Sequence, residues 1–255
     1  MACRALSTSK APAAFAACFG GDTSNAAELV SMTALRAGDL VLTGPNALER
    51  VVVNQHATDT RSVSLVKIET ADGAILTMTP DHAVAIDGVF VAASFAAVGS
   101  SLSTGVVITK VSSSSGRIIN PITASGQILA ADADGSRAPI LAATWPASVA
   151  QSFLAAPTSP LLATRLLARA APDAFQQFYT AAEHAFLDAA APALHAAAAA
   201  MPTMAQALGF VAADALLGLG FAVSQLAAVS IPLTVAGVAS LAMSHNQVSR
   251  RRLGE

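Results

Sequence analysis

The stretch VSLVKIETADGAILTMTPDHAVAIDGVFVA, residues 63–92, decides the fold class of this chain. It holds short apolar runs, which are separated by Ala71-Asp72-Gly73 and by Asp87-Gly88. Asp-Gly turns between such runs are typical of β-hairpins. Similar runs lie before and after this stretch, at 40–42, 51–53, 106–108 and 128–129. Many short strands at this spacing predict an all-β domain over residues 18–145.

The composition changes to Ala, Leu, Phe and Gln after this β-rich part. Over residues 146–202, apolar side chains recur at helical spacing and prolines interrupt the pattern. This combination predicts several short helices. The run at 196–200 is all alanine, and because alanine is the strongest helix former we expect helix there as well.

The C-terminal segment, residues 203–255, is the most hydrophobic part. The whole chain is 54% hydrophobic and only 12% charged, whereas a soluble domain is typically about 25% charged. Residues 215–249 contain no Asp, Glu, Lys or Arg, and about 20 apolar residues span a bilayer. We therefore expect one transmembrane helix within 216–243, the alternative being a very apolar buried hairpin. The arginines at 250–252 predict a cytosolic C-terminus, which places the β domain in the secretory pathway or at the cell surface.

Three motifs carry candidate chemistry, and they follow one another in a set order. They are Ala17-Cys18-Phe19-Gly20-Gly21, Thr79-Pro80-Asp81-His82 and Asn120-Pro121-Ile122-Thr123. Cys3 and Cys18 are the two cysteines of the chain. Cys18 is therefore a nucleophile, a disulfide partner of Cys3 or a small buried apolar residue.

Together with Leu35-Arg36-Ala37-Gly38-Asp39, these motifs resemble the Hint domain of Hedgehog proteins over residues 18–130. The resemblance implies a horseshoe-like, pseudo-twofold all-β Hint domain that is followed by an α-helical, membrane-associated region. It also implies autocatalytic cleavage in cis, in which the Cys18 thiolate attacks the carbonyl of Ala17 and converts the amide to a thioester. Residues 1–17 are then the segment released, or the remainder of a longer N-terminal part.

The resemblance also assigns roles to the second motif. Thr79 would hydrogen-bond the scissile peptide, and His82 would exchange a proton with the leaving nitrogen, because histidine titrates near neutral pH. The place of the aspartate that activates the acceptor in Hedgehog proteins is held by His56, with Asp59 as the alternative. Both of these residues could equally be surface loop groups.

The acceptor of the thioester is left open by the sequence. Water and a sterol or other lipid alcohol are the candidates, since residues 146–202 resemble the sterol-recognition region of Hedgehog proteins. The second cysteine of that family is missing from 131–137, and splicing is disfavoured because the β region does not end in a His-Asn pair. We expect no other cofactor and no metal.

The expected partners are the chain's own N-terminal segment and membrane lipid. Nucleic acid is excluded, because the formal net charge is −2 and no basic patch is interleaved with aromatic residues. The competing interpretation is a non-catalytic, membrane-anchored Hint relic that acts as a structural or interaction module.

Overall fold

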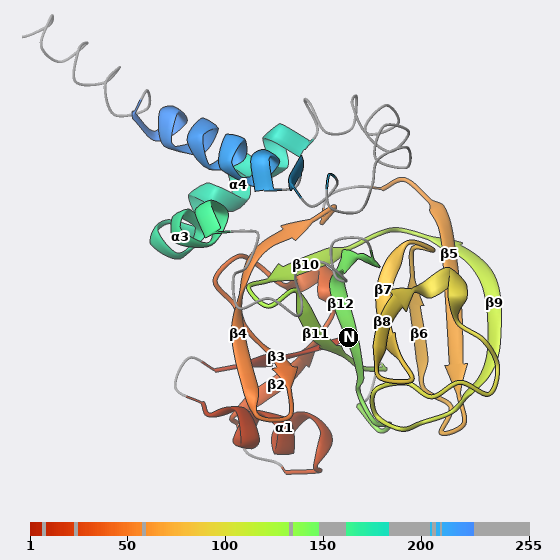
Figure 1. The fold of residues 1–255 in the computed structure, drawn as a ribbon. Coiled ribbons are helices and arrows are strands. Elements are labelled where there is room, and N and C mark those ends of the chain that lie inside the picture. Colours follow the sequence, from red (N-terminus) through yellow and green to blue (C-terminus); the bar gives the residue numbers. More distant parts are fainter. Residues whose placement is uncertain are drawn as a thin grey trace, which may run out of the picture. The chain divides into compact units, whose positions relative to one another are not determined.

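The computed structural model describes residues 1–6, 9–22, 25–57, 60–132, 135–147, 162–183, 205, 208–209 and 211–226 (Figure 1). The chain divides into two compact units, Met1–Ala215 and Leu216–Glu255. All the candidate site residues belong to the first unit.

Two antiparallel sheets make up most of the first unit. The larger one has the strand order β10-β4-β3-β1-β11-β12-β7-β8, and β2 pairs with β1. Its strands are β1 (Ala2–Ala5), β2 (Ala27–Val30), β3 (Leu40–Gly44), β4 (Ala47–Gln55), β7 (His82–Ile86), β8 (Val89–Ala92), β10 (Asn120–Thr123), β11 (Gln127–Ala130) and β12 (Ile140–Pro146). The smaller sheet, β6-β5-β9, consists of β5 (Val63–Thr70), β6 (Ile75–Met78) and β9 (Ile108–Gly116). The β character predicted for this part of the chain is confirmed.

The two turns predicted within 63–92 are present. Asp87 and Gly88 both have positive φ angles, 50° and 82°, as a tight two-residue hairpin turn requires. They join β7 to β8, with Ile86 opposite Val89. The first turn joins β5 to β6, and there the Thr70 hydroxyl donates to the Asp72 carboxylate at 2.5 Å.

The sequence predicted that residues 1–17 precede a β domain that starts at Cys18, but in the structure residues 2–19 pack as part of the β region. Residues 2–5 form β1, which pairs with β2, β3 and β11. Residues 11–19 form helix α1 (Ala11–Phe19), whose first turn contains a proline. Alanine favours helix and proline fits a first turn, so this local preference explains α1. The β region of the structure therefore starts at Ala2 and not at Cys18.

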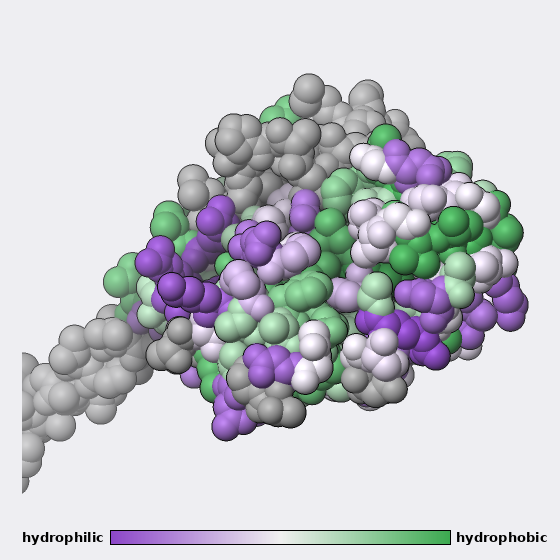
Figure 2. Space-filling model, turned by 90° about the horizontal axis from the view of Figure 1, so that it is seen from below, coloured by the Kyte–Doolittle hydropathy of each residue, from purple (hydrophilic) through white to green (hydrophobic). Residues whose placement is uncertain are grey.

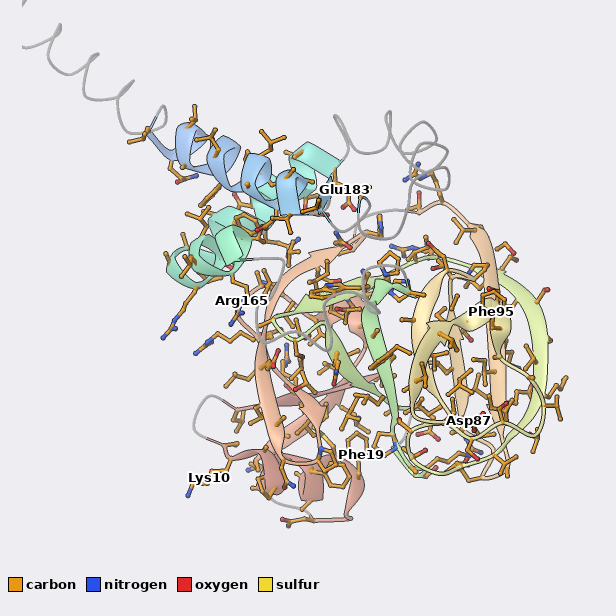
Figure 3. All side chains as sticks on the ribbon, viewed as in Figure 1. Lys10, Phe19, Asp87, Phe95, Arg165 and Glu183 are labelled. Atoms are coloured by element: carbon orange, nitrogen blue, oxygen red, sulfur yellow. A yellow bond between two sulfur atoms is a disulfide. The ribbon has the colours of Figure 1, made fainter. Side chains whose placement is uncertain are left out.

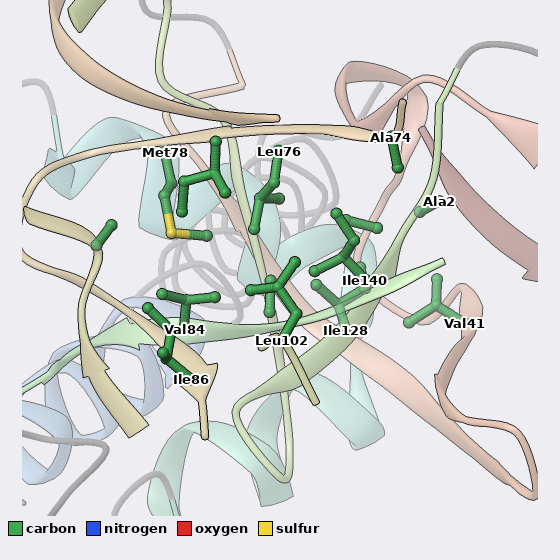
Figure 4. Packing of buried hydrophobic residues seen from close by; sticks show 14 of the residues in the cluster. Ala2, Val41, Ala74, Leu76, Met78, Val84, Ile86, Leu102, Ile128 and Ile140 are labelled. Atoms are coloured by element: carbon green, nitrogen blue, oxygen red, sulfur yellow. The ribbon is translucent and has the colours of Figure 1, made fainter. Parts of the chain in front are cut away.

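The larger sheet is packed on both of its faces. Side chains alternate between the two faces along a strand, and β11 illustrates this. Ile128 and Ala130 belong to the main core together with Leu76 and Met78 (Figure 4). Leu129 instead belongs to a second cluster, which contains Cys3, Ala14 and Cys18 and lies against α1. The sheet thus separates α1 from the main core.

Helices α3 (Leu162–Ala170) and α4 (Pro172–Ala182) lie within the predicted helical region, while residues 148–161 and 184–202 lie outside the described part. Residues 211–226 are also helical. The expected span at 216–243 lies mostly beyond the described residues, and within them no helix is long and apolar enough to cross a membrane.

Figure 2 shows apolar and polar residues in mixed groups on the face of the molecule seen from below.

Helix α4 is attached to the end of β4 by a pair of amide hydrogen bonds. The backbone N–H of Asn54 donates to the Gln176 side-chain oxygen at 2.8 Å, and the Gln176 side-chain nitrogen donates to the Asn54 carbonyl at 3.1 Å. The side-chain amide of Gln176 therefore pairs with the backbone of β4 as a neighbouring strand would. This attachment brings the C-terminal end of α4 next to His56.

Candidate active site

Thr79 and His82 are brought together by the turn between β6 and β7. The backbone N–H of His82 donates to the Thr79 carbonyl at 3.1 Å, which closes the turn. The Thr79 hydroxyl and His82 Nδ1 are also 3.1 Å apart. The turn thus brings the side chains of two predicted site residues into contact, and this contact orients the imidazole.

The surroundings of His82 favour its neutral form. Burial lowers the pKa of His82 below its usual value near 6.5, and this effect outweighs the opposing charge of Asp81 and the hydrogen bond with Asn120. A neutral imidazole can accept a proton, and at a buried position it returns the proton readily because the charged form is poorly solvated there. His82 therefore has the chemistry expected of a general acid–base group.

Asn120 is a polar site residue to which the sequence assigned no role. It is buried, and its side-chain nitrogen donates to the Thr144 carbonyl at 3.0 Å and to the Gln55 side-chain oxygen at 2.9 Å. Its side chain also interacts with the His82 imidazole and opposes the lowering of the His82 pKa. The third sequence motif pointed to this position, because Asn120 is the first residue of that motif.

A cavity of about 170 Å³ lies beside His82 and is lined by Met78, Thr79, Asn120, Ile128, Ala142 and Thr144, among others. It is about as large as an engineered protein cavity of about 150 Å³ that binds benzene. The cavity combines polar groups at Thr79, His82 and Asn120 with an apolar wall. It can therefore accept a peptide unit or a small side chain.

The structure does not bring Cys18 to this cavity. Cys18 is buried and is joined to Cys3 by a disulfide, with the two Cα atoms 6.0 Å apart. Both cysteines belong to the second cluster, which lies against α1. That cluster is on the face of the sheet that does not line the cavity. The candidate scissile bond between Ala17 and Cys18 lies within α1. Of the alternatives for Cys18, the disulfide with Cys3 is the one that the structure contains.

His56 lies just after β4 and forms a second polar group. Its Nδ1 atom is 2.8 Å from Glu183 Oε1, and its backbone has a φ of 57°, which is uncommon for a residue other than glycine. Figure 3 shows Glu183 near the end of β4, and Phe19, the neighbour of Cys18, at the opposite end of the β region. The alternative residue Asp59 lies outside the described part of the chain.

Glu183 is a site residue that no signal in the sequence could have identified, because it contacts His56 across 127 positions of the chain.

Among the residues described, no group of three or more His, Cys, Asp or Glu side chains is arranged to hold a metal ion.

Comparisons with known proteins return intein splicing domains. No protein-family model matches the chain, and no curated protein matches it. It is similar to the Msm DnaB1 intein splicing domain bound with zinc, at 19% identity over 44% of this chain and 87% of that one, with a TM-score of 0.35. It is also similar to the MchDnaB-1 intein, at 17% identity over 45% and 88% of the two chains, with a TM-score of 0.36. A variant of that intein gives 20% identity, 45% and 89% coverage and a TM-score of 0.35. Intein splicing domains have the Hint fold, but at these TM-scores the likeness is too weak to assign a function.

Proposed function

We propose that this chain is a self-processing protein of the Hint type that cleaves itself at Ala17/Cys18 through a thioester. In the first step the Cys18 thiolate attacks the Ala17 carbonyl carbon, and a carbon–sulfur bond forms. The carbon–nitrogen bond then breaks, and His82 passes to the leaving amine the proton that it took from the Cys18 thiol. In the second step a hydroxyl compound, water or a lipid alcohol, takes over the acyl group.

The observation that carries this proposal is the arrangement of Thr79, His82 and Asn120 around one cavity. An amide is a poor electrophile because of its resonance, so its cleavage needs a proton donor for nitrogen and polar groups that bind the peptide. His82 is held by the Thr79 hydroxyl at 3.1 Å, and Asn120 lines the same cavity and interacts with the imidazole. Both kinds of group are therefore available at the cavity.

The disulfide adds a condition to the proposal. A cysteine reacts as a nucleophile only in its free thiolate form, so the Cys3–Cys18 disulfide must be reduced before Cys18 can react. Residues 11–19 must then rearrange, because Cys18 lies on the other face of the sheet from His82. Apart from the half-buried Phe15 and Phe19, α1 contributes only small side chains to its cluster, at Ala11, Ala14 and Cys18. Since a buried methylene contributes about 0.8 kcal/mol and a fully buried Phe side chain about 1.5–3 kcal/mol, detaching α1 costs several kcal/mol.

The proposal includes a membrane anchor within 216–243. It is supported by the exposed side chains of Leu216, Leu219, Val223 and Leu226, which are 56–71% accessible. Their spacing of three and four places them on one face of a helix. An apolar face of this kind suits contact with lipid, which would also bring a lipid alcohol close to the chain.

The second candidate is a non-catalytic module with the same architecture. The Cys3–Cys18 disulfide favours it, because a bond between β1 and α1 fits a structural role for both cysteines. In that case the Thr79–His82 pair only stabilises the turn between β6 and β7.

One experiment separates the two candidates. A reporter protein is fused ahead of Met1 of the full chain, and the fusion is treated with hydroxylamine in the presence of a phosphine reductant. The self-processing protein releases the reporter together with residues 1–17, and Cys18→Ala and His82→Ala do not. If the fusion stays intact under all conditions, the non-catalytic candidate is correct.

A further inference from the structure

We infer that Glu183 and His56 form a carboxylate–imidazole dyad that activates the hydroxyl acceptor of the thioester. Helix α4 would then bring a carboxylate to the second step, and the acceptor class would be water or an alcohol. This inference rests on the proposed function, because it concerns how the thioester is resolved.

The Glu183 carboxylate contacts His56 at two places. Its Oε1 atom is 2.8 Å from the ring atom Nδ1. The backbone N–H of His56 also donates to both carboxylate oxygens, at 3.3 Å and 3.2 Å. The carboxylate thus contacts both the ring and the backbone of the same residue, which restricts the position of the imidazole. The positive φ of His56 fits this arrangement, since such conformations persist where the surroundings enforce them.

The accessibility of the two side chains differs in the way that a general base requires. The His56 side chain is 30% exposed, whereas that of Glu183 is only 5% exposed. Bulk water therefore solvates the carboxylate poorly, and its contacts with His56 stabilise it. Because Nδ1 faces the carboxylate, Nε2 is the ring nitrogen that would meet an incoming hydroxyl. The same division of roles operates in catalytic triads, where a buried carboxylate orients a histidine.

The dyad is connected to the cavity at His82. Gln55, the neighbour of His56, accepts a hydrogen bond from Asn120 at 2.9 Å and donates one to the Tyr179 hydroxyl on α4. Asn120 in turn lines the same cavity as His82, and the charge of His56 acts to lower the pKa of His82. A thioester that forms beside His82 is thus within the neighbourhood of His56.

The proposed step needs no oxidant or further reactant. Nε2 of His56 takes the proton of the acceptor hydroxyl, and the oxygen forms a bond to the thioester carbonyl carbon. The carbon–sulfur bond breaks, and the Cys18 thiolate leaves with the electron pair. The protonated His56 then returns the proton to the sulfur, while Glu183 stabilises the transient imidazolium.

The test uses the reporter fusion of the full chain after reduction, with four forms: unsubstituted, His56→Ala, Glu183→Gln and the double variant. Release without any added nucleophile measures hydrolysis, which needs a base. Release by hydroxylamine measures thioester formation, because this strong nucleophile needs no activation. Glu183→Gln keeps the shape of the side chain and removes its charge, and Glu69→Gln in the smaller sheet is the matched control.

We expect hydrolytic release to fall about 10- to 100-fold in Glu183→Gln, the range for losing a hydrogen bond to a charged group. We expect His56→Ala to fall at least as far, and the double variant to fall no further than His56→Ala, because Glu183 acts through His56. Hydrolysis at the unsubstituted rate in Glu183→Gln, or effects that multiply in the double variant, would overturn the dyad while thioester formation stands. A reduced, unsubstituted fusion that hydroxylamine fails to cleave would overturn the proposed function and the dyad together.

Discussion

Cys3 and Cys18 are linked by a disulfide that connects β1 to α1 across 15 positions of the chain. The bond holds both sulfur atoms in the cluster beneath α1, on the face of the sheet away from His82. The redox state of this pair therefore decides whether Cys18 has a free thiol. It also decides whether the N-terminal residues are tied to the sheet.

The first prediction concerns this dependence on reduction. Hydroxylamine alone will leave the oxidised reporter fusion intact, because Cys18 has no free thiol in the disulfide and we expect hydroxylamine not to cleave that bond. Addition of a phosphine reductant will start the cleavage. Gel electrophoresis of the released reporter is the measurement.

Cys3→Ala is the control for this first prediction. It frees Cys18 permanently, so hydroxylamine will cleave this variant with and without reductant. Cleavage of Cys3→Ala that still depends on reductant would show that the disulfide is not the element that controls the reaction.

The second prediction concerns stability. A disulfide that closes a loop of about 15 residues stabilises a folded chain by about 3 kcal/mol, mainly by restricting the unfolded state. Reduction will therefore lower the free energy of unfolding by about this amount. Urea unfolding can be followed by the fluorescence of Trp145, which is the only tryptophan and is buried. Cys3→Ala must not respond to the reductant, and equal midpoints of the oxidised and reduced chains would contradict the prediction.

The third prediction concerns the pH dependence that His82 causes. Burial lowers the pKa of His82 in the folded chain below the ordinary value near 6.5. Between the two pKa values the unfolded chain binds a proton that the folded chain does not, so the free energy of unfolding decreases as the pH falls below about 6.5. His82→Gln removes this contribution. Urea unfolding of both chains at pH 7.5 and pH 5 is the measurement, and an equal loss of stability in both would show that the pKa of His82 is not the cause.

The fourth prediction concerns Gly126, which lies between β10 and β11. Its φ is 73°, and an added Cβ would lie 2.8 Å from a ring carbon of Trp145. Gly88 also has a positive φ, 82°, but an added Cβ there meets nothing within 4 Å. Gly88→Ala should therefore cost about 1–2 kcal/mol for the backbone conformation alone. Gly126→Ala should cost about 1–3 kcal/mol more because of overpacking. Thermal unfolding of the two variants tests the difference, and equal costs would show that Trp145 moves aside freely.

The parts of the fold and site that the sequence predicted depend on local signals. The turns at 71–73 and 87–88 require particular residue types, and so they located the strands around them. Thr79 and His82 are three positions apart, which let one turn bring them together. Asn120 was only marked as part of a motif, because its partners Gln55 and Thr144 come from distant strands.

The parts that the sequence did not predict depend on contacts between distant segments. β1 has only four residues, which is too short for a pattern, and its partners in β3 and β11 follow far along the chain. The contact of Glu183 with His56 exists because Gln176 attaches α4 to β4, and no local pattern encodes that attachment. The disulfide was one of the alternatives for Cys18, and only the packing of α1 beside β1 selects it.

The most direct test of self-processing is the mass of the fragment that the reduced fusion releases in hydroxylamine. The proposal predicts that the fragment ends at Ala17 and carries a hydroxamate at its C-terminal carbonyl, because hydroxylamine captures the thioester acyl group. The remaining chain will begin with Cys18. A fragment that ends at any other residue, or one released equally from Cys18→Ala, would contradict self-processing at this bond.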